Sequence, residues 1–405
     1  MTGYRELATR PVLSWALVVI CARLPVAMAP FALVLLARER PGGYALGAGL
    51  AAAYVIGEVA GSAVLGPWLR PRRARAHLAS GFAAGAASFA GAGLLPHAHP
   101  LAIGALAMAA GAAPAAAPGG LRTLLTSRLP DTLVVKALSL ESVLTYGVWA
   151  VAPAVTGALA LGVAAPLPLV LAAALMAAAT LGMWALPAGW DADGTDRDGA
   201  SLARTLARAW PIYLTGAAAM SLLALAEVVL PALLTQRSIA IAWAGPLLTA
   251  FAVASILGAI LYGARGSWPA SVRTQSLVLL LAVATCVALT AIAPSLPWIA
   301  TALTVAGFLA AAVQLSRNLS LREALPPSAQ AAGYSLLYAA TAVGYAASAT
   351  LAAAVQTTST PEKAILAGVA LTLALTATSA TAELTNPRRT SQPPNNSEPL
   401  NQRSP

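Results

Sequence analysis

The feature that most constrains this chain is a series of long apolar segments, separated by short groups of charged residues, proline and glycine. At a rise of about 1.5 Å per residue, a helix of each segment can cross the ~30 Å hydrocarbon core of a bilayer. Lipid offers the backbone no hydrogen-bond partners, so a crossing segment must be helical. The sequence therefore predicts an all-α integral membrane protein with twelve transmembrane helices, at 12–36, 44–66, 77–95, 100–121, 138–162, 166–187, 210–234, 241–264, 274–293, 297–317, 329–355 and 363–384.

Composition supports this prediction and excludes other classes of protein. Of the 405 residues, 59% are hydrophobic and 9% charged, whereas soluble domains carry about 25% charged residues. A soluble globule, a disordered chain and a nucleic-acid-binding domain are therefore excluded, and lipid is the expected surrounding. Cys21 and Cys286 both lie inside apolar segments, so we expect no disulfide framework, metal or other cofactor. The polar first ten residues and the long apolar run after them argue against a cleaved signal peptide.

Lysine and arginine are distributed unequally between the two sides of the predicted spans. With the N-terminus in the cytoplasm, the cytoplasmic segments carry eighteen of these residues and the outer loops carry four. The positive-inside rule then predicts that both termini are cytoplasmic, that the number of spans is even, and that the protein resides in the cell membrane. Arginine outnumbers lysine by 22 to 2, which is typical of a GC-rich bacterial genome.

Two polar stretches set the expected domain boundaries. A linker at 188–209 separates an N-terminal six-helix bundle, 1–187, from a C-terminal one, 210–385. The linker contains four closely spaced aspartates but lacks the glycine turn and the glutamate of a calcium-binding loop, so we interpret it as a solvated cytoplasmic linker. Residues 386–405 are rich in proline, asparagine, serine and arginine, which predicts a disordered cytoplasmic tail.

The two halves of the chain resemble each other at a nearly constant offset. The matches lie at equivalent places of a six-span unit, which indicates two pseudo-symmetric bundles related by an axis along the membrane normal, a layout found in transporters. Three pairs of segments carry the repeat: Gly61–Gly66 with Gly258–Gly263 at an offset of 197, and Leu129–Pro130 with Leu325–Pro326 and Ser139–Leu140 with Ser335–Leu336 at 196.

Several segments resemble the major facilitator superfamily, and the resemblance covers nearly the whole chain. They are Arg23–Met28, Gly66–Arg75, Arg122, Gly147–Gly157 and Leu261–Arg265. The loop after the second span stands where the family signature Gly-x-x-x-Asp-Arg-x-Gly-Arg-Arg belongs. It keeps the glycine and the arginines, at Gly66, Arg70, Arg72 and Arg73, but lacks the aspartate. The pattern is most similar to actinobacterial drug- and metabolite-efflux members, which implies a proton-coupled antiporter that works by alternating access.

Ionisable residues within the spans are the first site candidates, because a charge at the bilayer centre costs at least ~2.5–3.5 kcal/mol. Glu58, Glu141 and Glu227 are candidate proton carriers, since burial favours the neutral form of a carboxyl group. The alternative is a structural ion pair, either Arg23 with Glu58 or Arg122 with Glu141. A third role is open to Arg23, which is suited to hold an anionic group of a substrate.

The resemblance further implies that spans 1, 4, 7 and 10 line a central cavity. The candidate lining residues are Trp15, Tyr213, Gln314, Tyr146, Trp149, Tyr334 and Tyr338. For each aromatic residue, helix packing or lipid contact is the alternative. Such a cavity is mostly apolar, which favours a small amphipathic molecule over a sugar. Pro114 and Pro118, together with Gly119–Gly120, predict a helix that bends or ends early.

The predicted function is therefore secondary active export of a small amphipathic organic molecule, a drug or secondary metabolite, driven by the proton gradient. An uptake symporter or facilitator is the alternative, followed by a non-transporting receptor or scaffold on the same fold. An enzyme is not expected, because His77, His97 and His99 lie at span ends on opposite sides and no catalytic or phosphate-binding motif occurs. We expect a monomer that contacts lipid and a small-molecule substrate, and no nucleic acid.

Overall fold

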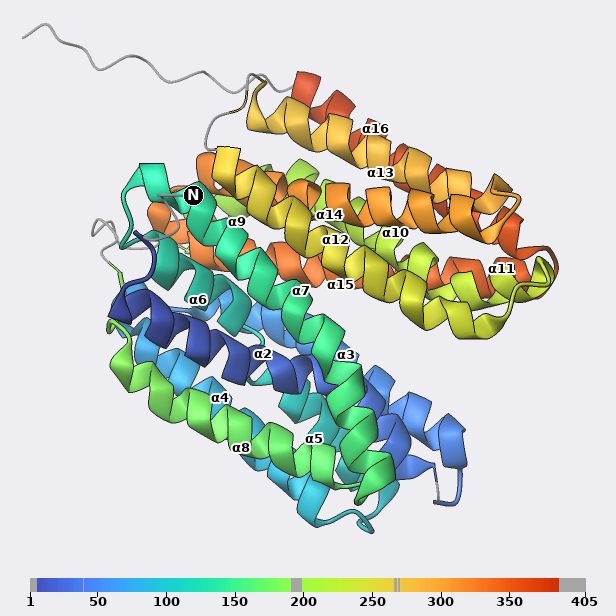
Figure 1. Cartoon of the computed structure of the whole chain (residues 1–405). Helices are drawn as coiled ribbons and strands as arrows, with labels where there is room; N and C mark the ends of the chain where they lie inside the picture. The colour runs from blue at the N-terminus through green and yellow to red at the C-terminus, as the bar shows by residue number, and fades with distance from the viewer. Residues whose placement is uncertain (1–5, 39, 191–198, 266–267, 269, 386–405) are drawn as a thin grey trace, which may run out of the picture.

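The computed structural model describes residues 6–38, 40–190, 199–265, 268 and 270–385, and these residues form helices without strands (Figure 1). The first half of the chain contains α2 (Arg10–Ala37), α3 (Gly43–Trp68), η1 (Pro71–Arg73), α4 (Ala74–Leu94), α5 (Pro100–Ala112), α6 (Ala117–Thr126), α7 (Asp131–Gly162), α8 (Leu167–Gly182) and η2 (Met183–Ala185). The second half contains α9 (Gly199–Arg208), α10 (Trp210–Val228), α11 (Leu230–Gln236), η3 (Ile241–Trp243), α12 (Ala244–Arg265), α13 (Val272–Ile292), α14 (Leu296–Ala324), α15 (Pro327–Gln356) and α16 (Pro361–Thr385).

Eleven helical segments of the described chain are long and apolar enough to cross a membrane, so this is a multi-pass membrane protein. The predicted third span corresponds to α4, whose 21 residues form a helix that packs on α5 and α8. Its sequence is mainly alanine, glycine and serine, and it is not among the eleven. Small residues allow close helix approach within a membrane, and this explains how α4 is accommodated between its neighbours.

Two spans are broken into shorter helices. The bend predicted around Pro114 and Pro118 is present, because turns at 113–116 separate α5 from α6. A second break, which the sequence analysis does not predict, separates α10 from α11 at Val229, two residues before Pro231. Proline lacks an N–H and its ring crowds the preceding turn, so a helix ends or kinks there.

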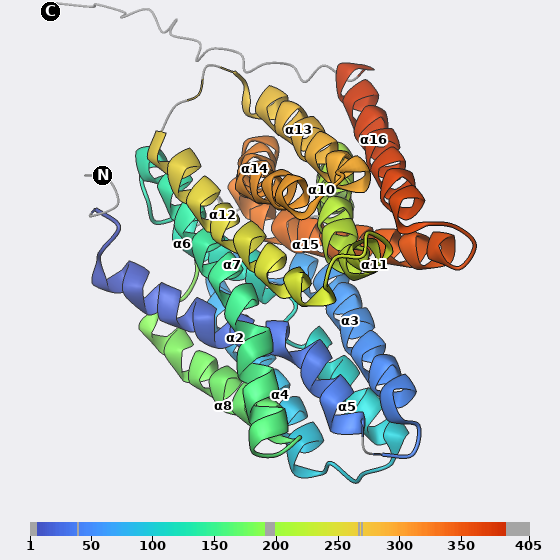
Figure 2. The same cartoon turned by 45° about the vertical axis from the view of Figure 1, so that its right-hand side comes forward.

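The helices form two bundles, with α2 to α8 in one and α10 to α16 in the other (Figures 1 and 2). Within the first bundle, α2 packs on α3, α7 and α8. Within the second, α10 packs on α15 and α16, and α14 packs on α12 and α13. Contact between the bundles comes mainly from three helix pairs, α3 with α15, α7 with α12 and α6 with α15. The predicted fold class is therefore confirmed.

The linker differs from the prediction of a wholly solvated segment. Residues 199–208 form the amphipathic helix α9, which packs on α10 and α15. Leu206 is 5% exposed and belongs to an apolar cluster with Ala332 and Tyr334, with Leu202 packed at its edge. Apolar residues four apart lie on one helix face, so α9 is held by this stripe. The aspartate group at 191–198 and the tail at 386–405 lie outside the described residues.

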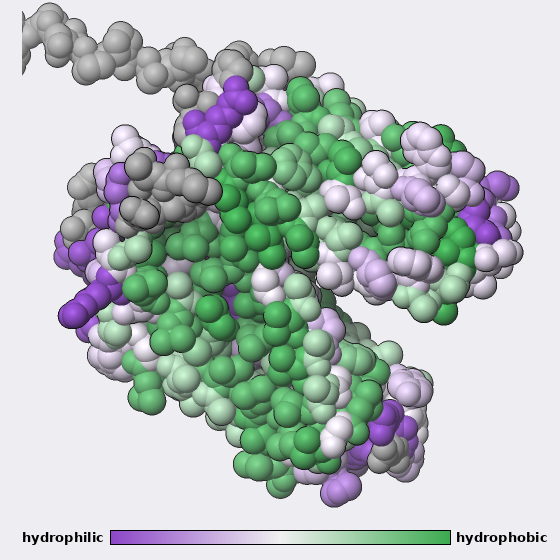
Figure 3. Space-filling view, in the orientation of Figure 1, coloured by the Kyte–Doolittle hydropathy of each residue, from purple (hydrophilic) through white to green (hydrophobic). Residues whose placement is uncertain are grey.

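The bundles meet at one end of the molecule and separate toward the other. Figure 3 shows a hollow between the two lobes, which opens on the side where α11 and the start of α12 lie. We call this side the open face; it carries Gly42–Tyr44 and Ile241–Trp243. The opposite side, which carries Pro71–Arg73 and Leu325–Pro326, is the closed face. The site below lies between the bundles, where α6 of the first bundle contacts α14 and α15 of the second.

Candidate functional site

The centre of the site is a buried ion pair between Arg122 on α6 and Glu141 on α7. Arg122 Nε donates to Glu141 Oε2 at 2.6 Å and its second guanidinium nitrogen donates to Oε1 at 2.9 Å. The two side chains are 9% and 2% exposed. A bidentate guanidinium–carboxylate pair of this kind is strong and directional. One of the two pairings predicted from the sequence is therefore formed.

A second guanidinium reaches the same carboxylate. Arg23 on α2 donates to Glu141 Oε1 and to the hydroxyl of Thr145, one turn further along α7. Its side chain is 15% exposed, and its Nε atom donates to no residue of the described chain. The predicted pairing of Arg23 with Glu58 is wrong: Arg23 points toward α7 and Glu58 lies on α3, where it has another partner.

Arg122 also joins the two bundles. Its first guanidinium nitrogen donates to Asn318 Oδ1 on α14 at 3.0 Å, and its guanidinium carbon lies 4.8 Å from the centre of the Tyr334 ring on α15. Tyr334, fully buried, donates from its hydroxyl to the Asn318 carbonyl oxygen at 3.2 Å. Arg122 and Asn318 are separated by 196 residues, the offset of the internal repeat. Two repeat-related positions therefore meet between the bundles.

Close packing of small residues seals one side of the closed face. A Cβ atom placed on Gly66 of α3 would lie 2.8 Å from Ser335 Oγ on α15. One on Gly119 of α6 would lie 2.5 Å from the same oxygen and would overlap the carbonyl oxygen of Ala331. Glycine is therefore required at both positions for α15 to approach the first bundle this closely.

The other side of the closed face is sealed by α7 and α12, the helix pair that the internal repeat relates to α3 and α15. Ser139 on α7 donates to the carbonyl oxygen of Ala259 on α12 at 2.6 Å. Around this bond, Leu138 of α7 packs in one buried cluster with Tyr262 of α12 and Leu315 of α14. Ser139 and Ser335, which match in the repeat, thus occupy the two contact lines between the bundles.

Two carboxylates are paired with tyrosines of α15. Tyr338 donates to Glu58 Oε1 at 2.8 Å across the bundles, and Tyr345 donates to Glu227 Oε2 at 2.8 Å within the second bundle. Tyr334, Tyr338 and Tyr345 are spaced by four and seven residues, which places them along one face of the helix. We call this row the tyrosine face of α15. Tyr345 and Asn318 are not among the predicted site residues.

The remaining cavity candidates do not gather around this site. Trp15 is 3% exposed and donates from Nε1 to the Leu121 carbonyl oxygen at 2.8 Å, so it packs within the first bundle. Trp149 is 53% exposed on the outer half of α7. Tyr146 packs at the edge of the α7–α12 cluster, and Tyr213 packs beside α9 in the cluster that holds the linker helix. Gln314 is half-buried on α14.

The loop after the second span forms the short helix η1. Arg70, Arg72 and Arg73 are exposed there. Arg75 belongs to the resembling segment but not to the candidate site residues. Its guanidinium carbon lies 4.7 Å from the ring centre of Trp184, and it donates to the Leu186 carbonyl oxygen at 3.4 Å. Its signal in the sequence is Trp184 in η2, which directly follows α8. Gly66 contributes through close packing, as described above.

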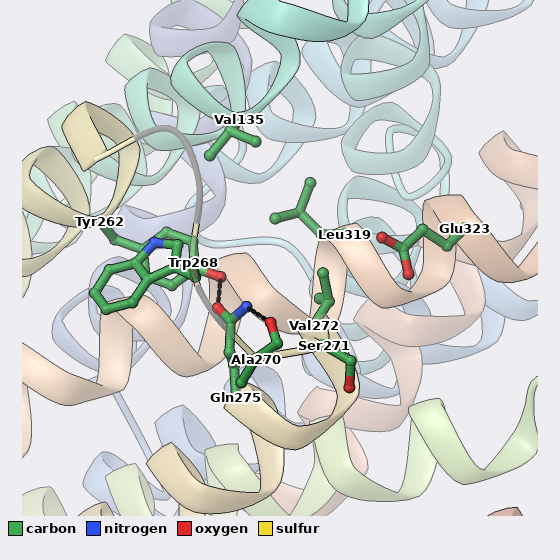
Figure 4. A pocket seen from close by; sticks show the side chains of 9 residues that line it. All are labelled: Val135, Tyr262, Trp268, Ala270, Ser271, Val272, Gln275, Leu319 and Glu323. Atoms are coloured by element: carbon green, nitrogen blue, oxygen red, sulfur yellow. Dashed lines mark hydrogen bonds between the residues drawn. The ribbon is translucent and has the colours of Figure 1, made fainter.

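A separate pocket lies on the closed face between α7 and the second bundle (Figure 4). It has a volume of about 350 Å³. On one side, Tyr262 donates from its hydroxyl to Gln275 Oε1 at 2.6 Å and stacks against Trp268 at 5.1 Å between ring centres. Glu323 lies on the opposite side, on α14. Within the described residues, no group of histidine, cysteine, aspartate and glutamate is placed to hold a metal ion.

No protein-family model and no curated protein sequence matches this chain. Solved structures do match it. The human organic anion transporter MFSD10 (TETRAN) has 16% identity and a TM-score of 0.69, covering 91% of this chain and 99% of that one. A bacterial homologue of the iron transporter ferroportin, in an outward-facing state, has 15% identity and a TM-score of 0.71, covering 92% and 100%. The major facilitator superfamily transporter FucP, in the outward conformation, has 14% identity and a TM-score of 0.68, covering 92% and 99%. The chain therefore has the fold of major facilitator superfamily transporters.

Proposed function

We propose that this chain is a proton-coupled secondary transporter of the major facilitator superfamily, which exports a small amphipathic organic molecule by alternating access. The observation that carries the proposal is the arrangement of the two bundles, which close on each other at one face and leave a hollow at the other. The three structural neighbours are named for an organic anion, iron and fucose. They support transport as the function. Because they are named for different molecules, the substrate of this chain has to be inferred from its own residues.

The contacts between the two bundles at the closed face are of a kind that can form and break during a conformational change. Among the described residues they include small-residue packing, a few hydrogen bonds between the bundles, and an ion pair at the rim, Arg322 with Asp131 at 2.9 Å, where Asp131 is 88% exposed. An exposed pair of this kind contributes only about 0–1 kcal/mol. The apolar cluster that crosses the bundles, with Leu138, Tyr262 and Leu315, must also separate when the bundles rock. With the N-terminus in the cytoplasm, as the distribution of basic residues predicts, the closed face is cytoplasmic.

Glu58 and Glu227 are the proposed proton carriers. Each carboxylate accepts a hydrogen bond from a tyrosine of α15, and neither has a basic partner in the ion pairs of the described residues. Glu141 has a different role, because two guanidinium groups hold it in the charged form. A carboxylate held in that way is a structural element of the first bundle and is poorly suited to exchange a proton.

The experiment uses the full chain in proteoliposomes with a pH gradient and a panel of fluorescent anionic, neutral and cationic amphipathic compounds. Glutamine has the size of glutamate but does not titrate. If a carrier is replaced, gradient-driven transport is expected to fall at least about tenfold, while exchange of substrate across the membrane continues. The variants are Glu58→Gln and Glu227→Gln, and the control is Glu323→Gln, which removes a carboxylate exposed at the closed face.

Two results would contradict parts of the proposal. If both glutamine variants transport against a gradient as well as the wild type does, neither glutamate carries the proton. If transport persists after a protonophore has collapsed the proton gradient, with sodium also removed, the chain is a facilitator. Export as the direction follows the similarity to efflux members, and vesicles of known orientation test it directly. Localisation to the cell membrane of a bacterium belongs to the same proposal.

A further inference from the structure

We infer that Arg23 binds the anionic group of the transported molecule, which makes the substrate class an amphipathic organic monoanion such as an aryl carboxylate. The inference rests on the proposed transport function and names the substrate of that same site. It is carried by the excess of positive charge at the buried junction of α2, α6 and α7, and by the unused hydrogen-bonding capacity of one particular guanidinium group.

The charges of the cluster do not balance. Arg23, Arg122 and Glu141 together contribute two positive charges and one negative charge. Arg122 binds both oxygens of Glu141, so these two side chains form a complete pair. Arg23 shares only one oxygen of that carboxylate and is therefore the surplus charge. Burial of a charge without a full counter-charge is costly, and proteins retain such groups for function.

The hydrogen bonds distinguish the two arginines in the same way. A guanidinium group has five N–H donors. Arg122 uses all three of its nitrogen atoms in hydrogen bonds, and its face is covered by the ring of Tyr334. Arg23 uses one proton of each terminal nitrogen atom, and its buried Nε donates to no described residue. Each terminal nitrogen keeps a second proton, so an incoming carboxylate can accept from these two N–H groups in the bidentate manner that guanidinium groups favour.

Arg23 is also the accessible member of the cluster. Its side chain is 15% exposed, compared with 9% for Arg122 and 2% for Glu141. It shares Glu141 with Arg122, and Arg122 contacts Asn318 and Tyr334 of the second bundle. Tyr334 lies one helical turn before Tyr338, which binds Glu58. An anion at Arg23 would therefore lie in the part of the first bundle that faces the tyrosine face of α15.

The test measures binding of two probes to the purified full chain in detergent. 1-Naphthylacetate and 1-naphthylacetamide share one aromatic body and differ in charge. We expect the wild type to bind the carboxylate at least about tenfold more tightly than the amide, because a hydrogen bond to a charged group is worth that factor or more. Arg23→Gln should abolish the preference, and Arg23→Lys should retain part of it. Arg10→Gln, which removes an exposed charge from the same helix, should leave the preference unchanged.

Folding of the key variant is expected, because Arg23→Gln leaves Glu141 paired with Arg122, and a melting temperature close to the wild-type value checks this. The inference is refuted if the wild type shows no preference for the carboxylate, including the case in which neither probe binds, or if Arg23→Gln keeps the preference. Its failure can be separated from failure of the proposed function. Gradient-driven transport of neutral or cationic compounds without any preference for anions would leave the transporter proposal intact and refute the role of Arg23. Arg23-dependent binding without gradient-driven transport would support the role of Arg23 and contradict the transporter proposal.

Discussion

Replacement of Gly119 by alanine should force the closed face apart. The added Cβ would lie 2.5 Å from Ser335 Oγ and 3.0 Å from Ser335 N, and Gly119 and Ser335 belong to different bundles. Ordinary contacts between heavy atoms lie near 3.5–4.0 Å, so α6 and α15 must separate by roughly 1 Å. That displacement would also stretch the 3.0 Å hydrogen bond between Arg122 and Asn318.

The expected magnitude follows from the cost of overpacking. Insertion of a methyl group into a well-packed contact costs about 1–3 kcal/mol. The contact exists only while the closed face is closed, so the whole cost falls on that state. In a two-state equilibrium, 1–3 kcal/mol changes the ratio of the two populations by about 5-fold to 150-fold. Gly119→Ala should therefore enrich the alternative state, in which the bundles separate at the closed face and meet at the open face.

Distances between spin labels on the open face measure that ratio. Tyr44 at the start of α3 and Ile241 in η3 are 67% and 61% exposed and belong to different bundles. After replacement of the native Cys21 and Cys286 by alanine, cysteines at these two positions carry the labels. In the Gly119→Ala variant the distance distribution should move toward the shorter distances, and the ratio of the two populations should change by at least about fivefold.

Two other glycines provide matched controls. A Cβ on Gly57 of α3 would overlap the carbonyl oxygen of Met108 on α5, a contact within one bundle, so Gly57→Ala should lower the melting temperature without a change in the distance ratio. Gly147 has open space around its Cβ position, so Gly147→Ala should change neither quantity. An unchanged distance distribution in a folded Gly119→Ala variant would refute the role of this contact in the closure of the face.

Two further predictions concern topology and the buried charges. Cysteines placed in the 66–76 loop or in the 386–405 tail should react with an impermeant thiol reagent only from the cytoplasmic side, and labelling of either from outside would overturn the proposed orientation. Glu141→Gln should lower stability by about 3–5 kcal/mol, because it leaves Arg23 and Arg122 buried without a carboxylate. The double variant with Arg23→Gln should recover part of that loss in a thermal unfolding measurement, and no recovery would mean that repulsion between the arginines is unimportant.

The sequence predicts the positions of the helices closely, because a span is set by the hydropathy of its residues and by the thickness of the bilayer. Neither of these depends on tertiary contacts. The span predicted at 44–66 is Gly43–Trp68, and the one predicted at 329–355 is Pro327–Gln356. The prediction fails where a helix continues beyond the apolar window. The fifth helix starts at Asp131 instead of 138, because its first two turns extend past the apolar segment into the polar closed face. The linker helix α9 is missed for a related reason, since its short apolar stripe is stabilised only by tertiary contact.

The site is predictable in part. Buried ionisable residues stand out in a sequence because each is costly in lipid, and four of those named occur in the hydrogen-bonded site. Their partners depend on how each helix is rotated about its axis, which composition does not reveal. The pairing of Arg23 with Glu58 was therefore wrong. Asn318 could have been found from its offset of 196 from Arg122, and Tyr345 from its spacing of seven from Tyr338.

The tyrosine face of α15 makes the two proposed proton carriers unequal. A proton can drive a conformational change only if its binding group has different surroundings in the two states. The bond between Tyr338 and Glu58 crosses the bundles, so separation of the closed face must break it. The bond between Tyr345 and Glu227 joins α15 to α10 of the same bundle, so rigid-body rocking leaves it intact. In the proposed cycle Glu58 is therefore the carrier whose protonation is coupled to the opening of the closed face. Glu227, which keeps its bond to Tyr345 in both states, can act as a carrier only through a change in its access to the two sides of the membrane.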